Sequence, residues 1–139
     1  MEMKLAECLK EAETIAIIGC SKNKYRTSYH IASYLQEQGY TIIPVHPDYE
    51  EVLGEKAFKS ILDLPDDIEV DIVDIFRDSA HTADMVREII EWSEETGQKP
   101  LVWTQLGVSS DEAKALSEEA GLPYVEEKCM MVEHQRLLG

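Results

Sequence analysis

Short apolar runs alternate with longer amphipathic segments along the whole chain. The apolar runs have the length of buried strands and are bounded by glycine, proline or polar residues. They predict strands at about residues 14–19, 40–45, 70–76, 100–107 (a strand with its following loop) and 122–129. Between them, apolar residues at helical spacing predict helices at about 27–38, 79–96 and 111–121, with a short helix near the C-terminus.

Strands that alternate with helices are typical of a parallel sheet, because each parallel pair needs a crossover connection and that connection is usually a helix. The pattern therefore predicts one α/β domain over residues 1–139, a doubly wound parallel sheet of about five strands flanked by helices. Pro47, Gly54 and Pro65 interrupt the stretch 46–65, which we expect to be a loop with one short helical turn. In such sheets ligands bind beyond the carboxyl ends of the strands, so the residues that follow each strand are the candidates for function.

Composition narrows the class of protein. A chain of 139 residues with 44% hydrophobic residues is large enough to bury a core as one domain. Its formal charge of −15 opposes general attraction to nucleic acid or to an anionic membrane. The N-terminal residues lack the pattern of a secretory signal, no apolar run has the length of a membrane span, and the three cysteines lie far apart without a metal-ligand spacing. These features predict a cytoplasmic protein with reduced thiols, no metal site and no nucleic-acid or membrane partner.

A cationic turn follows the first predicted strand. The sequence GCSKNKYRTS, residues 19–28, lies between that strand and the N-terminus of the next helix, where free backbone N–H groups attract anions. No Asp or Glu occurs from residue 14 to residue 36, although the chain averages about one acidic residue in five. Lys22, Lys24 and Arg26 therefore have no acidic neighbour in sequence, and the hydroxyls of Ser21, Thr27 and Ser28 accompany them. We expect the turn to bind phosphate, with Arg26 as a two-pronged donor and Lys22 as a point charge.

The turn differs from two common nucleotide-binding motifs. It lacks the GxGxxG pattern of dinucleotide-binding domains, and Val45 at the end of the second strand is followed by His46 and Pro47 instead of an acid that binds a ribose hydroxyl. GxxxxGK[ST] is also absent, which excludes a P-loop hydrolase of the usual form. The sequence favours a ligand with adenosine and phosphates other than NAD.

Several ordered motifs resemble the stand-alone prokaryotic CoA-binding domain family, which is related to the CoA-binding domain of the succinyl-CoA synthetase alpha subunit. The resemblance extends over about residues 14–137 and implies a Rossmann-like fold that binds coenzyme A or an acyl-CoA. The motifs are IAIIGCSKNKYRTSYHIASYL, GYTIIPVHPDYEEVLGEKAFKSILDLP, DIVDIFR, VWTQLGV and EEKCMMVEH.

The resemblance also implies which residues form the site. It assigns the phosphate-binding turn to Gly19, Ser21, Lys22, Arg26 and Ser28, and it places Val45, His46 and Pro47 beside the adenine. Phe76 and Arg77, at the end of the neighbouring strand, would lie along the cofactor, and Gln105 and Gly107 would close the site on the next loop. Two positions depart from the family pattern: Cys20 stands where a small residue such as alanine is usual, and His46 stands where asparagine is typical.

The residues themselves favour CoA over NAD. CoA carries a 3′-phosphate beside its pyrophosphate and needs more cationic groups, which Lys22, Lys24, Arg26 and Arg77 supply. The turn Val-His-Pro after the second strand has no acid to repel a phosphorylated ribose.

Two classes of function remain open. The first is a non-catalytic module that binds CoA or acyl-CoA as a sensor, carrier or regulator. The second is an enzyme, either an NAD-linked oxidoreductase or an acyl-CoA ligase component that needs a partner subunit. Either class is compatible with a homo-oligomer or with a protein partner. The synthetase relatives place their catalytic machinery in further domains, and no catalytic constellation is evident here, which favours binding. Cys129 and His134 are more readily read as a core cysteine and a surface histidine than as a catalytic pair.

Cys20 is the one candidate for covalent chemistry. At a helix N-terminus and close to two lysines its thiolate is expected to be favoured. One hypothesis is that it forms a mixed disulfide with the thiol of CoA, and the alternative is an inert residue packed under the turn.

Overall fold

Five parallel strands form the central sheet, in the order β2-β1-β5-β6-β7. The computed structural model describes residues 2–138. The strands are β1 (Thr14–Ile18), β2 (Thr41–Val45), β5 (Ile72–Ile75), β6 (Leu101–Thr104) and β7 (Tyr124–Val125). Every neighbouring pair in this sheet is parallel. The α/β fold with a five-stranded, doubly wound parallel sheet is confirmed.

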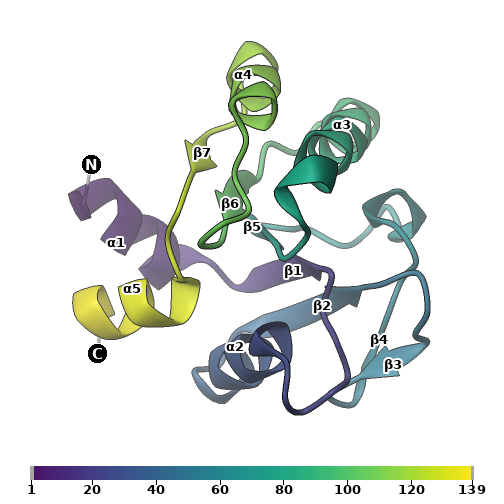
Figure 1. Ribbon diagram of the computed structural model, residues 1–139, viewed down its shortest axis with the longest axis vertical. Coiled ribbons are helices and arrows are strands. Elements are labelled where there is room, and N and C mark those ends of the chain that lie inside the picture. Colours follow the sequence, from purple (N-terminus) through teal and green to yellow (C-terminus); the bar gives the residue numbers. More distant parts are fainter. Residues whose placement is uncertain (1, 139) are drawn as a thin grey trace.

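Helices cover both faces of the sheet (Figure 1). They are α1 (Glu2–Glu11), α2 (Thr27–Glu37), α3 (Ser79–Thr96), α4 (Asp111–Glu119) and α5 (Met130–Leu138). Helices α1, α2 and α5 pack on one face and α3 and α4 on the other, so the chain has two hydrophobic layers. Strand β1 contributes to both layers: Ile15 and Ile17 join the first and Ala16 and Ile18 the second. This two-sided burial explains why the strands are continuous apolar runs.

The connections of the sheet change direction next to β1. The chain crosses through α2 from β1 to β2 on one side, and later reaches β5 on the other side of β1. The carboxyl ends of β1 and β5 therefore lie side by side at the point where the connections diverge, and α2 begins there (Figure 1). In open α/β sheets this position is the usual place for a ligand.

The N-terminal helix α1 was not predicted from the sequence. Among residues 4–11, whose side chains the structure describes, the buried ones are Leu5 and Leu9, which are one helical turn apart. The helix packs against α5, at the other end of the chain. Two apolar residues one turn apart are too weak a pattern to predict a helix unless the helix that packs against them is known.

The segment from His46 to Pro65 contains a small hairpin in addition to the expected helical turn. The 3₁₀ helix η1 (Ile61–Asp63) is that turn. Strands β3 (Glu51–Val52) and β4 (Glu55–Lys56) pair in antiparallel fashion around Leu53 and Gly54, both at positive φ. A leucine at φ 55° is rare, which is why this sequence gives little hairpin signal.

The C-terminal part differs from expectation in length. Strand β7 has two residues instead of most of the stretch 122–129, and the rest is a connection to α5. Helix α5 confirms the short helix predicted near the C-terminus. None of the helices in the described range is long and apolar enough to cross a membrane.

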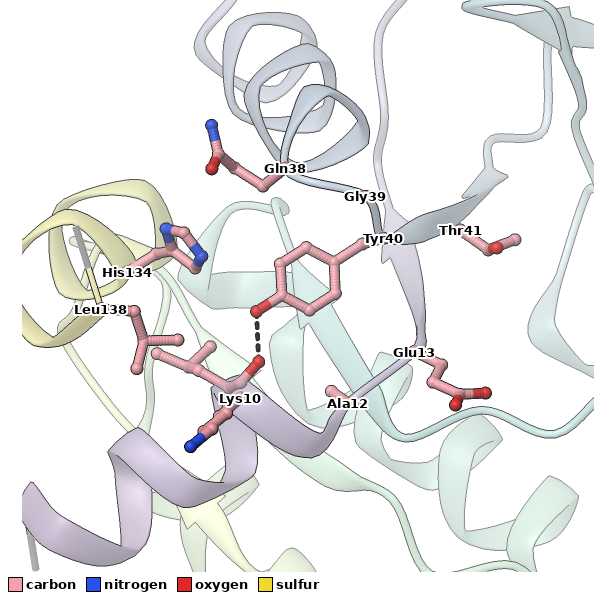
Figure 2. A pocket seen from close by; sticks show the side chains of 10 residues that line it. Lys10, Ala12, Glu13, Gln38, Gly39, Tyr40, Thr41, His134 and Leu138 are labelled. Carbon is pink, nitrogen blue, oxygen red and sulfur yellow. Dashed lines mark hydrogen bonds between the residues drawn. The ribbon is translucent and has the colours of Figure 1, made fainter.

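Hydrogen bonds of two tyrosines hold α5 and α1 in place. The Tyr34 hydroxyl lies 2.7 Å from Nδ1 of His134 on α5. The Tyr40 hydroxyl donates to the backbone oxygen of Leu9 at the end of α1, and its ring lies beside His134 (Figure 2). His134 is buried, contrary to the surface position expected, and burial lowers its pKa below the ordinary value.

We predict that His134 makes the fold less stable in mild acid. Because its folded-state pKa is lowered, the unfolded chain takes up a proton more readily, so stability falls as the pH drops through the ordinary histidine value of about 6.5. Urea unfolding of the wild type between pH 7.5 and pH 5 measures this slope, and His134→Gln should reduce it. His30→Gln, at an exposed position on α2, is the matched control. Equal slopes in the wild type and His134→Gln would contradict this role.

Candidate functional site

A cleft of about 1040 Å³ lies across the carboxyl ends of β1, β5 and β6. It is large enough for a nucleotide-sized ligand. Each of these strands contributes the residues that follow it, as the sequence predicted for a doubly wound sheet. These residues are Gly19 and Ser21 after β1, Phe76 and Arg77 after β5, and Gln105 and Gly107 after β6.

A second hollow of about 510 Å³ lies at the opposite end of the sheet (Figure 2). Lys10, Glu13, Tyr40 and His134 are among the side chains around it. It adjoins the amino ends of β1 and β2 and the C-terminal end of α2. The C-terminal end of a helix exposes carbonyl oxygens, which repel anions. The hydroxyl of Tyr40 is already bonded to Leu9. The cleft at the carboxyl edge is therefore the better candidate.

Side-chain hydrogen bonds shape the turn between β1 and α2. The Ser21 N–H donates to Oγ of Ser28 at 3.0 Å, and the Asn23 N–H donates to Oγ of Ser21 at 3.0 Å. The Tyr25 N–H donates to Oδ1 of Asn23 at 2.9 Å. These bonds fold the turn back over the start of α2, so Ser21 and Ser28 are buried parts of its framework.

The N-terminus of α2 has no internal cap. Arg26 precedes the helix in extended conformation and its side chain makes no capping hydrogen bond. The backbone N–H groups of Thr27, Ser28 and Tyr29 donate no hydrogen bond within the described range. Free N–H groups at the positive end of a helix are favourable for an anion.

The cations of the site have no internal counterion. Lys22, Lys24, Arg26 and Arg77 form no ion pair within residues 2–138. Arg77 lines the cleft, and its Nε is buried without a hydrogen-bond partner in the described part of the chain. A buried N–H group without an acceptor is costly, and an anionic ligand beside Arg77 would supply one.

Aromatic side chains lie at the β2 end of the cleft. His46 and Tyr49 stack with ring centroids 4.1 Å apart and an interplanar angle of 23°. Nζ of Lys22 lies 5.1 Å from the centroid of the Tyr49 ring. Burial, and to a lesser extent Arg77, lowers the pKa of His46, although Asp48 opposes the shift. The lowered pKa favours the neutral form of the His46 ring at neutral pH.

A smaller cavity of about 180 Å³ adjoins the cleft beyond this stack. Val45 and Pro47 line it, and it shares Gly19 and Arg77 with the cleft. The residues that end and follow β2 therefore lie next to the cationic turn after β1.

Gly19 brings the central strands close together. Its φ is +85°, and a Cβ atom at this position would lie 2.2 Å from the backbone oxygen of Phe76. Only glycine satisfies both conditions without movement of the backbone. The turn and the end of β5 can therefore share one cleft.

Cys20 does not have the environment that the sequence suggested. Its side chain is fully buried in the layer that contains α2, and it lines neither cavity. Burial, followed by the negative charge of Asp74, raises the pKa of the Cys20 thiol to about 12. The expectation of a favoured thiolate was wrong, because the side chain points away from the lysines into the core.

Cys129 is the cysteine that lines the cleft. It is partly buried and precedes α5. His134 lies at the other hollow, bonded to Tyr34, so the two residues do not form a thiol and imidazole pair. Among the described residues no group of three or more His, Cys, Asp and Glu side chains could hold a metal ion.

A buried polar pair lies under the β6 end of the cleft. Nε2 of Gln105 donates to both carboxylate oxygens of Asp74, at 2.8 and 3.0 Å. Asp74 is fully buried in β5, and burial raises its pKa well above the ordinary value although the Gln105 hydrogen bond opposes this. An acid within a run of apolar strand residues was the available signal in the sequence. Next to this pair, the Gly107 N–H donates to Glu127 at 3.0 Å, which ties the closing loop to the connection after β7.

Most of the sequence matches a known family. The family model described as CoA binding domain matches residues 13–135. This chain belongs to the CoA-binding domain family. The protein YneT of Bacillus subtilis is 33% identical over 131 residues, which cover 94% of this chain and 92% of YneT. A protein from Pyrococcus horikoshii OT3 has a solved structure with a TM-score of 0.91 and 38% identity, covering 100% of this chain and 93% of that one.

The CoA-binding domain family also includes parts of larger enzymes. An ADP-forming acetate–CoA ligase of Methanocaldococcus jannaschii is 38% identical over 61 residues, which cover 44% of this chain and 9% of the ligase. The similarity is therefore limited to a small part of that enzyme.

The fold places most of the candidate site residues in the cleft or the adjoining cavity. Gly19, Ser21, Arg26, Ser28, His46, Phe76, Arg77, Gln105 and Gly107 line the cleft. Val45 and Pro47 line the adjoining cavity, whereas Cys20 lies beneath the turn and the exposed Lys22 lies beside Tyr49. Sequence reasoning missed the cleft residues Tyr25 and Leu106, which are 94% and 66% exposed.

We predict that Gly19→Ala strongly destabilises the protein. An alanine here would combine the strain of a left-handed backbone with a steric clash against a backbone oxygen. Together these two costs should lower the free energy of unfolding by roughly 3 kcal/mol or more. Urea unfolding measures the effect. Gly39→Ala is the control, because Gly39 has φ +99° but a Cβ atom added there would meet no other atom within 4 Å, so only the backbone strain applies. Similar losses in both variants would show that the approach to Phe76 is unimportant.

Proposed function

We propose that this chain binds coenzyme A or an acyl-CoA in the cleft at the carboxyl edge of the sheet, as a non-catalytic sensing or carrier module. The observation that carries the proposal is that Arg77, which forms no ion pair within residues 2–138, and the uncapped N-terminus of α2 line the same cleft. A phosphorylated ligand would satisfy both groups at once. Membership of the CoA-binding domain family supports CoA as that ligand.

The order of the strands suggests how the ligand lies. The aromatic pair His46 and Tyr49 and the adjoining cavity, at the β2 end, suit an adenine ring. The turn before α2 suits the phosphates, with Arg26 and Arg77 as charged donors. The pantetheine arm would then extend past β5 toward Gln105 and Cys129 at the β6 end.

Exposed apolar side chains support a ligand with a partly apolar arm. Of the four large hydrophobic residues that are exposed in the described range, Tyr25 and Leu106 line the cleft. Exposed apolar groups that gather at one place are typical of binding sites. A ligand across the cleft would cover both.

The side chains in the cleft favour binding over chemistry. No hydrogen-bonded pair of a nucleophile and a base lines it in the part of the chain that the structure describes. Cys129 has no imidazole beside it, since His134 is bonded elsewhere. Catalysis by a thiol or hydroxyl nucleophile usually needs such a partner.

A second candidate is a component of an ADP-forming acyl-CoA ligase, favoured by the 38% identity with part of the Methanocaldococcus jannaschii enzyme. In that case the same cleft binds CoA and the reaction requires further protein segments. Incubation of the chain, purified from its native cells together with any bound partner subunit, with acetyl-CoA, ADP and phosphate separates the two proposals. The binding proposal expects no ATP, whereas ATP formation above a boiled control would replace it with the ligase proposal.

Calorimetric titration with CoA, dephospho-CoA and NAD, side by side, tests the proposed ligand. We expect CoA to bind, dephospho-CoA to bind more weakly for lack of the 3′-phosphate, and NAD to bind weakly or not at all. Binding of NAD in preference to CoA would support the oxidoreductase alternative. Binding of none of the three would overturn the proposal.

We predict that Arg26→Ala weakens CoA binding with little effect on stability. Loss of one charge-assisted hydrogen bond is worth roughly 1.5–3 kcal/mol, or about 10- to 150-fold in Kd. Arg87→Ala is the matched control, because Arg87 is bonded to Asp84 and Glu112 on the α3 side, outside the cleft. If Arg26→Ala lowers the unfolding midpoint but leaves the Kd unchanged, Arg26 has a structural role only.

A further inference from the structure

Asp74 and Gln105 come from adjacent strands in the centre of the sheet. Asp74 lies opposite Trp103 in the parallel register of β5 and β6, and Gln105 follows two residues later on the same face. The Gln105 side chain is 5% exposed and reaches back to Asp74, whose side chain is fully buried. Gln105 lines the cleft at its β6 end, and Asp74 lies beneath it.

The hydrogen bonds of this pair determine which end of the amide faces the ligand. Both carboxyl oxygens of Asp74 lie within 3.0 Å of Nε2 of Gln105, and a carboxyl group can donate at most one proton. Rotation of the amide by 180° would therefore leave at least one contact between two oxygens with no hydrogen between them, whether Asp74 is ionised or protonated. Oε1 of Gln105 therefore points away from Asp74, and it accepts no hydrogen bond within residues 2–138.

A buried carboxylate of this kind is unfavourable for stability alone. Asp74 is surrounded by apolar strand residues, and Gln105 is the one side chain in the described range that donates to it. Taking a carboxylate out of water with so few donors opposes folding. A role in orienting Gln105 would account for an acid at this position.

We propose that Asp74 is a positioning residue that makes the β6 end of the cleft an acceptor site, where Oε1 of Gln105 binds an N–H group of the ligand. This inference rests on the proposed function. If the phosphates lie at the N-terminus of α2, the part of CoA that reaches β6 is the pantetheine arm, which carries two amide N–H groups. Asp74 thereby contributes to recognition of the arm without touching it.

The test compares CoA with adenosine 3′,5′-bisphosphate, which has the same nucleotide part but no arm. The ratio of the two Kd values isolates the contribution of the arm. Asp74→Asn allows the amide of Gln105 to turn, because asparagine offers a donor as well as an acceptor. Gln105→Met keeps the length of the side chain and removes the acceptor.

We expect Asp74→Asn and Gln105→Met each to weaken CoA relative to adenosine 3′,5′-bisphosphate by about 3- to 10-fold, the range of one hydrogen bond. The double variant should lose no more than Gln105→Met alone, because Asp74 acts through Gln105. Asp71→Asn is the control: Asp71 accepts from the backbone of Glu13 and Thr14 at the other end of the same strand, and its substitution should leave the ratio unchanged.

Three results would overturn the inference. The first is an unchanged ratio of the two Kd values in Gln105→Met. The second is that Asp74→Asn weakens the binding of CoA and of adenosine 3′,5′-bisphosphate equally. The third is that the double variant loses the sum of the two single losses of CoA binding. Each of these leaves the proposed function intact, since CoA still binds the wild type. Failure of the wild type to bind either ligand would overturn the proposed function and this inference together.

Discussion

The close approach of two backbone segments at the centre of the sheet determines where the site can form. Gly19 follows β1 and would place a Cβ atom 2.2 Å from the backbone oxygen of Phe76, which follows β5. Because glycine has no such atom, the ends of these strands meet, and the turn that leads to α2 lies directly beside Arg77. The uncapped helix, the unpaired guanidinium and the pair formed by Asp74 and Gln105 all depend on this contact for their relative positions.

The charges of the molecule are distributed so that the cleft differs from the rest of the surface. The chain carries a formal charge of −15, yet the turn from Gly19 to Ser28 contains only cationic and neutral side chains. On the other face, Arg87 pairs with Asp84 and Lys114 with Glu126. Within residues 2–138, Arg26 and Arg77 line the cleft without an ion pair, next to a turn that contains no acid, and this local excess of positive charge supports an anionic ligand.

The sequence alone was sufficient for the fold class and for the cationic turn, because both depend on local patterns. Apolar runs alternating with helical stripes predicted the parallel sheet, and the lack of acids between residues 14 and 36 located the turn. Properties that depend on distant contacts were missed. Helix α1 packs against α5, from the other end of the chain. The Cys20 thiol is buried by helices and strands whose positions cannot be inferred from residue spacing. Asp74 is hydrogen-bonded to Gln105, 31 residues later in the sequence. Sequence reasoning found the residues after each strand but could not tell which way their side chains point.

The acidic surface has a consequence for how a polyanion would reach the cleft. At low ionic strength, where the Debye length reaches about 30 Å at 0.01 M, the approaching molecule meets the net negative field of the whole chain, and the cationic turn dominates only close to the cleft. Added salt therefore has opposite effects on the two stages of an encounter: it weakens the repulsion that slows arrival, and it weakens the attraction that delays departure. A protein of this kind exchanges its ligand faster as ionic strength rises, whatever happens to its affinity.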